Sequence, residues 1–145
     1  MAMDDKVVTT SAPIHGSCLC GAIAFEVDEL AGPIGHCHCQ TCRKAHSAAF
    51  ATTARVKRKH FRWTQGESLL KHFESSPGKL RHFCGDCGSQ LVAEWVDQPT
   101  VILRLGVLDN DPGATAVVHI WTSHDRPWLA YSPDLPHYPE GVPHK

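Results

Sequence analysis

Seven cysteines in three tight clusters constrain this chain more than any other feature of its sequence. They stand as Cys18-Leu-Cys20, Cys37-His-Cys39-Gln-Thr-Cys42 and Cys84-Gly-Asp-Cys87. An odd number of cysteines argues against a closed framework of disulfides. In a reducing compartment, closely spaced cysteines serve mainly as metal ligands or as reactive thiols. The clusters therefore predict metal–thiolate chemistry.

The spacing within each cluster suits a tetrahedral zinc ion. Zinc holds sulfur at about 2.3 Å, so its ligand sulfurs lie about 3.8 Å apart. A C-x-C pair on an extended segment directs both thiols to one side of the chain. A C-x-x-C pair brings its sulfurs together through a tight turn, and a glycine follows Cys20 and Cys87 directly, at positions 21 and 88. Glycine provides the backbone freedom that such turns use.

The ligand count predicts two unequal sites. Two pairs make a closed, structural set of four thiolates, namely Cys18, Cys20, Cys84 and Cys87. The other three can share a second ion whose fourth position stays open, as in catalytic zinc, and they are Cys37, Cys39 and Cys42. Four thiolates with Zn²⁺ carry a formal charge of about −2 and three carry about −1, so the second ion is more electrophilic.

Two alternatives stay open at this level. The set of three can be completed by a neighbouring histidine and so become a second structural site; the candidates are His36, His38 and His46. A different partition forms a zinc ribbon from the two C-x-x-C pairs, Cys39/Cys42 and Cys84/Cys87. Tetrahedral thiolate sets favour zinc over iron, although spacing alone does not settle the metal.

Polar residues beside the second set are candidates for contacts with a substrate. Arg43, Lys44 and His46 follow it directly and can meet an anion or relay a proton, or they can form a solvated turn. His36 and His38 alternate around Cys37 and can support the metal ligands or line the core.

A basic run interleaved with aromatic residues suggests a nucleic-acid surface or, more simply, a strand end with solvated charges. It comprises Arg55, Lys57, Arg58, Lys59, His60 and Arg62, with Phe61 and Trp63 between and after them. The whole chain has a formal net charge of −1, which argues against a strongly electrostatic nucleic-acid binder. We therefore expect the solvated strand end. Three tryptophans, Trp95, Trp121 and Trp128, are expected in the core or in a pocket wall.

Short apolar alternations predict one mostly β domain. In the segment that begins at Gly21, the side chains of Ile23, Phe25 and Val27 share one face. Further strands are expected at residues 48–56, 61–63, 69–73, 80–83, 91–95, 100–105 and 116–121, with one short helical turn at Gln40–His46. Residues 1–13 are expected to be a frayed tail, 14–138 the zinc-binding β domain and 139–145 a C-terminal tail. Prolines from Pro133 onward predict an extended surface strap.

Neither a membrane span nor a secretory signal is expected from the sequence. No apolar run approaches the roughly 18 residues of a transmembrane helix, and the N-terminal segment lacks a basic region followed by an apolar one. The expected location is the cytoplasm.

The clusters together resemble those of the glutathione-dependent formaldehyde-activating enzyme family, which shares its domain with centromere protein V. The resemblance rests on Gly16-Ser-Cys18-Leu-Cys20-Gly21, Cys37-His-Cys39-Gln-Thr-Cys42-Arg43-Lys44 and Phe83-Cys84-Gly-Asp-Cys87-Gly88. It implies a small single-domain Mss4-like β fold, a structural zinc on the four-cysteine set and a labile or catalytic zinc on the other three. The activity that it implies is a carbon–sulfur lyase reaction, the condensation of formaldehyde with glutathione to S-hydroxymethylglutathione.

Two classes of function therefore compete. One is a zinc enzyme that acts on thiol–aldehyde adducts through the three-cysteine site, with a thiol such as glutathione and a small aldehyde as partners. The other is a zinc-stabilised binding module without catalysis, whose partner is a protein or a nucleic acid. An exchangeable ligand position at the second zinc distinguishes the first class from the second.

Overall fold

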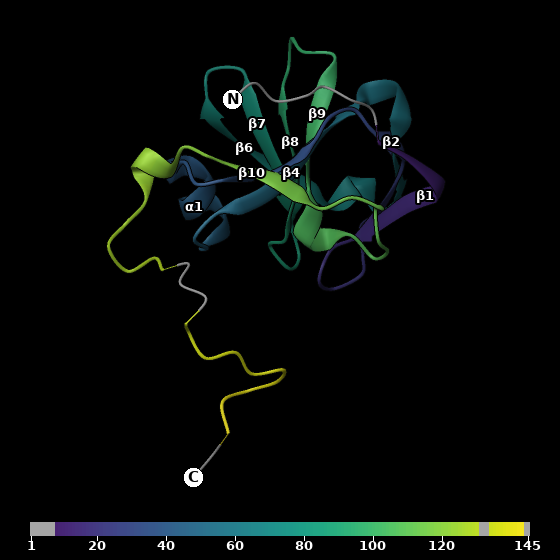
Figure 1. Ribbon diagram of the computed structural model, residues 1–145. Coiled ribbons are helices and arrows are strands. Elements are labelled where there is room, and N and C mark those ends of the chain that lie inside the picture. Colours follow the sequence, from purple (N-terminus) through teal and green to yellow (C-terminus); the bar gives the residue numbers. More distant parts are fainter. Residues whose placement is uncertain (1–7, 131–133, 144–145) are drawn as a thin grey trace.

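The computed structural model describes residues 8–130 and 134–143 (Figure 1). Their strands are β1 (Val8–Ser17), β2 (Ala24–Leu30), β3 (Ile34–Cys37), β4 (Ala51–Lys57), β5 (Phe61–Gln65), β6 (Leu70–Ser76), β7 (Lys79–Cys84), β8 (Gln90–Trp95), β9 (Thr100–Arg104) and β10 (Ala116–Ile120). One α-helix, α1 (Gln40–His46), follows β3. Short 3₁₀ turns are η1 (Arg58–His60), η2 (Glu67–Leu69), η3 (Leu105–Val107) and η4 (Thr122–His124). The protein is thus mostly β, as predicted.

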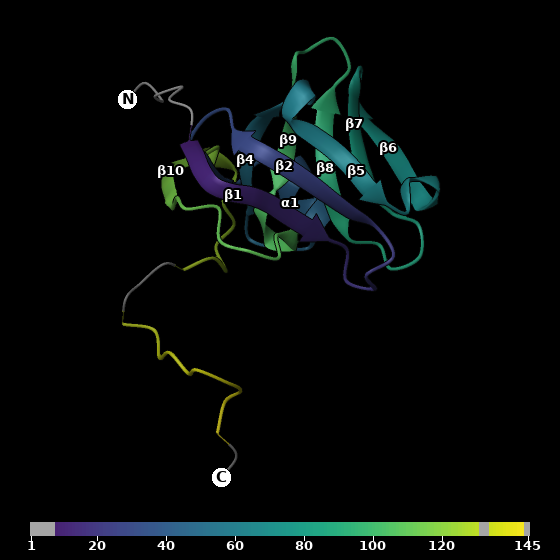
Figure 2. The ribbon, with the colours of Figure 1, turned by 90° about the vertical axis from the view of Figure 1, so that its right-hand side faces the viewer.

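The strands form two sheets that pack on each other. A three-stranded sheet has the order β1-β2-β5, and a seven-stranded sheet has the order β10-β3-β4-β9-β8-β7-β6. Neighbouring strands are antiparallel except β10 and β3, which run parallel. In Figure 2 the small sheet lies in front of the middle of the large one.

The core lies between the two sheets because apolar side chains alternate along the strands. The predicted face of the first apolar segment is fully buried, with Ile23, Phe25 and Val27 at most 1% exposed. Strand β9 contributes Val101 and Leu103 from the large sheet. Burial of these alternate positions is the main force that holds the sheets together.

An aromatic cluster closes one part of this core. The ring of Phe25 stacks on that of Phe61 with centroids 5.3 Å apart. Trp63 packs edge-on against Phe61 at 4.9 Å. Phe61 and Trp63 of the basic run therefore pack against the core. The ring faces that contact the core are not accessible to the bases of a nucleic acid.

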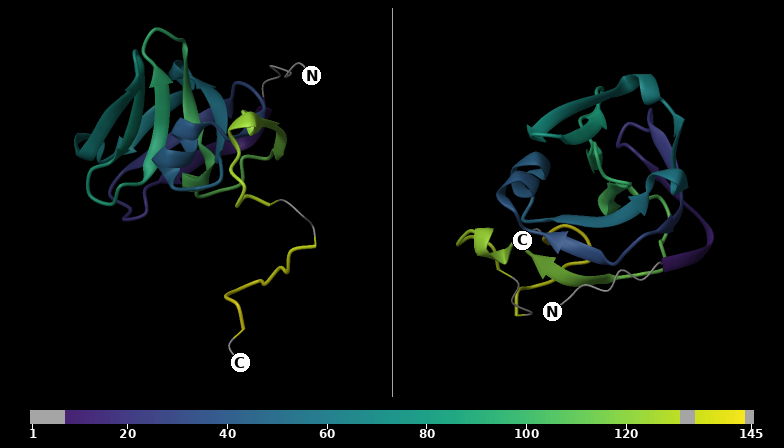
Figure 3. Two further views of the ribbon diagram at one scale, coloured as in Figure 1. Left: turned by 90° about the vertical axis from the view of Figure 1, so that its left-hand side faces the viewer. Right: turned by 90° about the horizontal axis from the view of Figure 1, so that it is seen from above.

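The opposite face of the seven-stranded sheet carries the helix. Figure 2 shows the small sheet in front of the large sheet, and the left view of Figure 3 shows α1 in front of it from the other side. Alternation sends Val101 and Leu103 into the core, so Ile102 and Arg104 project toward the helix side. Both of these residues line a cavity beside α1. This face therefore positions the candidate site.

Two strands were absent from the sequence-based expectations. β1 is polar and contains Pro13, and β3 has only four residues, two of them His36 and Cys37. Neither segment shows the apolar alternation that reveals a strand. β1 is paired with β2 from Val8 onward, so strand structure begins within the segment that we expected to be a frayed tail; residues 1–7 of that tail lie outside the described residues.

The end of the chain also differs from expectation. Residues 134–143 are all exposed and extend away from the sheets (Figures 1 and 2), instead of crossing the surface as a strap. The prolines in this segment lack the N–H needed for sheet pairing. The domain limits at residues 14 and 138 stay a prediction. Among the described residues, no helix has the length and apolar character required to cross a membrane.

Candidate metal centre and its cavity

The structure brings the first and third cysteine clusters together into one group of four. Their sulfurs all lie within 4.8 Å of one another. The Sγ atoms of Cys18 and Cys20 are 3.6 Å apart, and those of Cys20 and Cys84 are 3.9 Å apart. Tetrahedral zinc requires about 3.8 Å between ligand sulfurs. The group therefore fits a zinc ion without rearrangement.

Backbone N–H groups point at two of these sulfurs. Ile23 N–H donates to Cys18 Sγ at 3.3 Å, and the N–H groups of Asp86 and Cys87 both donate to Cys84 Sγ at 3.4 Å. Hydrogen bonds of this kind stabilise the charged form of a ligand and fix its orientation. They are what a thiolate that binds a metal requires.

Glycines permit the turns that form the four-cysteine group. Gly21 and Gly88 both have a φ of +80°, a conformation that other residues rarely adopt. Gly21 N–H donates to the carbonyl of Cys18, and Gly88 N–H donates to that of Cys84, each at 2.9 Å. The role that we predicted for these two glycines is confirmed.

The middle cluster forms a separate group of three. The sulfurs of Cys37, Cys39 and Cys42 lie within 4.8 Å of one another at the junction of β3 and α1. Cys39 is the N-cap residue of α1, and its sulfur accepts a hydrogen bond from Cys42 N–H at 3.3 Å. Among the described residues no histidine, aspartate or glutamate joins this group. The zinc-ribbon partition is therefore wrong, because its two C-x-x-C pairs lie in different groups.

Buried cations surround the three-cysteine group. Arg81 on β7 is 3% exposed, and its two terminal nitrogens lie 3.8 and 3.9 Å from Cys42 Sγ. Arg104 on β9 is 4% exposed, and its positive charge also acts on this sulfur. The pKa of Cys42 is lowered to about 4, first by a hydrogen bond from the Cys37 thiol and then by Arg104 and Arg81. The site is therefore built to hold a thiolate.

A cavity of about 500 Å³ opens onto the three cysteines. Its wall includes Lys79 and Trp95, which are register partners on β7 and β8. Trp121 and His124, which follow β10, line it as well. The space is large enough for a small organic substrate. The expectation that Trp95 and Trp121 form pocket walls agrees with this arrangement.

A buried histidine anchors the wall that follows β10. His38 is fully buried, and its Nδ1 lies 2.7 Å from the Asp125 carboxylate. Its Nε2 lies 2.8 Å from Nδ1 of His119, a residue of β10. Nearby, His36 Nδ1 lies 2.8 Å from Thr52 Oγ1. Both histidines thus hold neighbouring chain segments in place, and neither completes the three-cysteine group.

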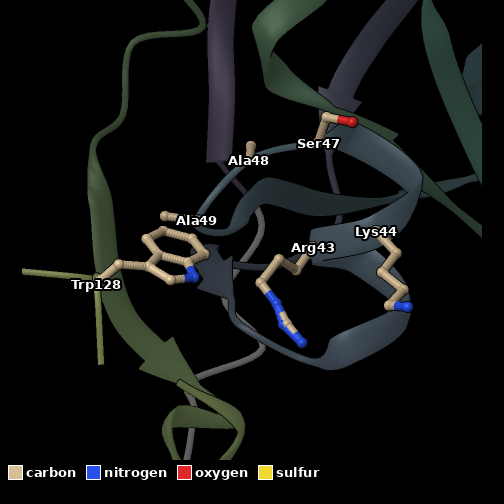
Figure 4. A pocket seen from close by; sticks show the side chains of 6 residues that line it. All are labelled: Arg43, Lys44, Ser47, Ala48, Ala49 and Trp128. Atoms are coloured by element: carbon tan, nitrogen blue, oxygen red, sulfur yellow. The ribbon is translucent and has the colours of Figure 1, made fainter. Parts of the chain in front are cut away.

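Arg43 and Lys44 line another cavity, which has no lining residue in common with the first. This cavity has a volume of about 560 Å³. In Figure 4 the side chain of Arg43 lies between those of Trp128 and Lys44. The two cations that the sequence placed near the cysteines therefore lie beside a neighbouring hollow. Their contact with a substrate stays a prediction.

His46, at the C-terminal end of α1, is held neutral. Burial, together with the positive charge of Arg104, lowers its pKa to about 4. Its Nε2 is buried and has no hydrogen-bond partner within the described part of the chain. At neutral pH the ring therefore carries no charge with which to meet an anion.

The low pKa of His46 predicts a loss of stability in mild acid. The unfolded state, whose histidine pKa is about 6.5, binds the proton first, so stability falls as the pH drops from about 6.5 toward 4. Between pH 7 and pH 5, the wild type should lose about 1 kcal/mol more unfolding free energy than His46→Gln. Urea unfolding of both proteins at both pH values measures this difference. Equal losses would contradict the burial of a neutral ring.

Three residues of the basic run pair with acidic side chains of β2 and β8. Arg62 pairs with Glu26 and Asp28. Arg58 pairs with Glu94, and His60 Nδ1 lies 3.1 Å from Asp28. These pairs favour the solvated strand end over a nucleic-acid surface.

Comparison with known proteins identifies the family. The sequence model of the glutathione-dependent formaldehyde-activating enzyme family matches residues 13–124, well over half of the chain and all seven cysteines. The chain belongs to this family. No curated protein matches it.

A solved structure supports the fold of this family member. The crystal structure of a Rhodobacter sphaeroides protein, a structural genomics target, superposes with a TM-score of 0.59 at 22% sequence identity. The match covers 72% of this chain and 98% of that one. At this level of identity, the likeness concerns the fold alone.

Three cations at the site of this family member were not predicted from the sequence. Lys79, Arg81 and Arg104 stand far from the middle cysteines in sequence and reach them only through sheet pairing. The available signal was alternation: Lys79 and Arg81 are two apart on one strand, so their side chains share a face. Two cations on one face of a strand, with the apolar Leu80 between them, indicate a polar site on that face.

Proposed function

We propose that this protein is a zinc-dependent enzyme of the carbon–sulfur lyase type, which joins a thiol to a small aldehyde and cleaves the same adduct. The observation that carries the proposal is the difference between the two cysteine groups. One has four sulfurs, which is a complete ligand set for zinc, and the other has three sulfurs facing a cavity. An open ligand position at a cavity is the arrangement of catalytic zinc.

The residues present fit two zinc ions. The four-cysteine group would hold the structural ion, and Cys37, Cys39 and Cys42 would hold the second. With three protein ligands, a bound zinc supplies a Lewis acid that favours the thiolate form of a thiol or polarises a carbonyl. Glutathione and formaldehyde are the partners that the name of the family suggests, and the proposed location is the cytoplasm.

The reaction itself needs only one proton transfer. The thiol loses its proton, its sulfur forms a bond to the aldehyde carbon, and the electron pair of the C=O π bond moves to oxygen. That oxygen takes up a proton, so the S-hydroxymethyl product contains all atoms of both reactants. In the reverse direction the C–S bond breaks and the same proton returns to sulfur.

His124 is the residue of the cavity wall that we assign to stabilise the aldehyde oxygen. Its Nδ1 accepts a hydrogen bond from Gln40 N–H at 3.1 Å. The neutral ring therefore carries its proton on Nε2, and the residue lines the cavity. In the proposed reaction, Nε2–H donates a hydrogen bond to the oxygen as its negative charge develops.

Exchange spectroscopy tests the activity directly. Formaldehyde and glutathione combine without an enzyme, so the quantity to measure is the exchange rate between free and S-hydroxymethylated glutathione, with ¹³C-formaldehyde and NMR. The zinc-loaded protein should accelerate this exchange in proportion to its concentration. No acceleration by any thiol and aldehyde tried, with both ions bound, would contradict the proposal and favour a binding module.

A further inference from the structure

The cations at the three-cysteine group lack the carboxylate partners that other arginines of this protein have. Arg58 and Arg62 are partly exposed and pair with acidic residues. Arg81 and Arg104 are almost fully buried, yet within residues 8–130 and 134–143 neither forms an ion pair with a carboxylate. Arg104 Nη2 is buried and has no hydrogen-bond partner among the residues that the structure describes. Buried charges of this kind require a counter-charge nearby.

The cysteines supply enough counter-charge for the empty site but not for the site with a metal bound. Three thiolates balance three cations, which are Lys79, Arg81 and Arg104. A bound divalent metal ion adds two positive charges to the same site, and no aspartate or glutamate belongs to the described wall of the cavity. The loaded site therefore has a surplus of positive charge. A thiolate ligand removes one unit of it, and a second negative group is needed to remove the rest.

Of the three cations, Lys79 is the least buried and is therefore the one that a second negative group reaches most easily. It is half-buried in the wall of the cavity, and its Nζ lies 5.3 Å from the centre of the Trp95 ring. Ser76, which precedes it across the β6–β7 turn, lines the same wall. Burial lowers the pKa of Lys79, and the charges of Arg81 and Arg104 lower it further. A carboxylate placed here would relieve the repulsion among the three cations.

We propose that the cavity selects thiols that also carry a carboxylate, and that Lys79 is the residue that binds this carboxylate. The inference rests on the proposed function, because it takes the three-cysteine group as the place where the substrate sulfur binds. It goes further by naming the residue of the cavity that recognises the carboxylate and so determines which thiols bind. Uncharged and cationic thiols should bind weakly.

A pair of thiols that differ in one charge tests the proposal. Isothermal titration of the zinc-loaded protein with 3-mercaptopropionate and with its methyl ester gives both affinities without any measurement of turnover. The acid should bind at least about tenfold more tightly than the ester. Lys79→Met keeps an unbranched side chain opposite Trp95 without the charge, and it should reduce the affinity for the acid to that for the ester. Affinity for the ester should not change.

The control is Lys57→Met, which removes an exposed lysine of β4 that does not line the cavity. It should keep the full preference for the acid, and thermal unfolding verifies the fold of each variant. If Lys79→Met fails to fold, Lys79→Gln replaces it. Equal affinities for acid and ester in the wild type would overturn the carboxylate site while leaving the proposed function intact. A preference that survives in both Lys79 variants would overturn the role of Lys79, and no binding of either thiol would overturn the proposed function as well.

Discussion

Replacing Cys39 by serine should remove one metal ion and all catalysis while leaving the fold intact. Cys39 is partly exposed and belongs to the three-cysteine group. Two remaining sulfurs hold zinc far less tightly than three. Because even the loss of a supporting residue around a metal costs 10- to 100-fold, the loss of a ligand should cost more than about 100-fold in turnover.

Serine at this position preserves the local structure. Cys39 is the N-cap residue of α1 and accepts a hydrogen bond from Cys42 N–H. Serine is among the preferred N-cap residues and can accept the same bond. The variant therefore separates loss of the metal from loss of the helix.

Three measurements on Cys39→Ser test this expectation together. Elemental analysis should show one zinc per chain instead of two, circular dichroism should show an unchanged fold, and NMR exchange should show only the uncatalysed rate. Two retained zinc ions would refute the assignment of Cys39 as a ligand. Retained turnover after loss of one ion would show that the three-cysteine group is not the site of catalysis.

The same substitution at Cys84 should instead destroy the fold. Its side chain is fully buried, and its sulfur belongs to the group that connects the end of β1 with the turn after β7. Structural zinc contributes about 10–16 kcal/mol in small zinc domains. A domain of this size has a total stability of about 5–15 kcal/mol. Loss of this zinc should therefore leave little or no folded protein at 37 °C.

Cys84→Ser and Cys39→Ser serve as controls for each other because each removes one thiol. If Cys84→Ser protein is soluble, thermal unfolding measures its loss of stability. If it is not, the fraction of the protein found in inclusion bodies measures the loss of folded protein. A chelator strong enough to strip the four-cysteine group should unfold the wild type in the same way. A Cys84→Ser variant with the Tm of the wild type would contradict a structural role for this group.

Much of the metal centre could be predicted from the sequence because its ligands are local pairs. The spacing in Cys18-Leu-Cys20 and Cys84-Gly-Asp-Cys87 requires nearby sulfurs whatever the rest of the fold does. Counting ligands then separated four cysteines from three, and the structure shows the same two groups. Most strands were also predicted, since apolar alternation such as that of Ile23, Phe25 and Val27 reports burial directly.

The cavity could not be predicted in the same way because it is assembled across the sheet. Lys79 and Arg104 come together through the pairing of β7, β8 and β9, and this register is not visible in a single sequence. Proximity along the chain favoured Arg43 and Lys44 instead. On a helix, residues one or two positions from Cys42 do not share its face, so Arg43 and Lys44 line the other hollow.

The central claim is that one cysteine group is complete and that the other accepts a ligand from outside the protein. X-ray absorption at the zinc edge measures the average number of sulfur ligands per zinc in the fully loaded protein. The account predicts about 3.5 without substrate and about 4 after addition of glutathione. A value that glutathione leaves unchanged would contradict the account, because the second ion would then have no position open to a thiol.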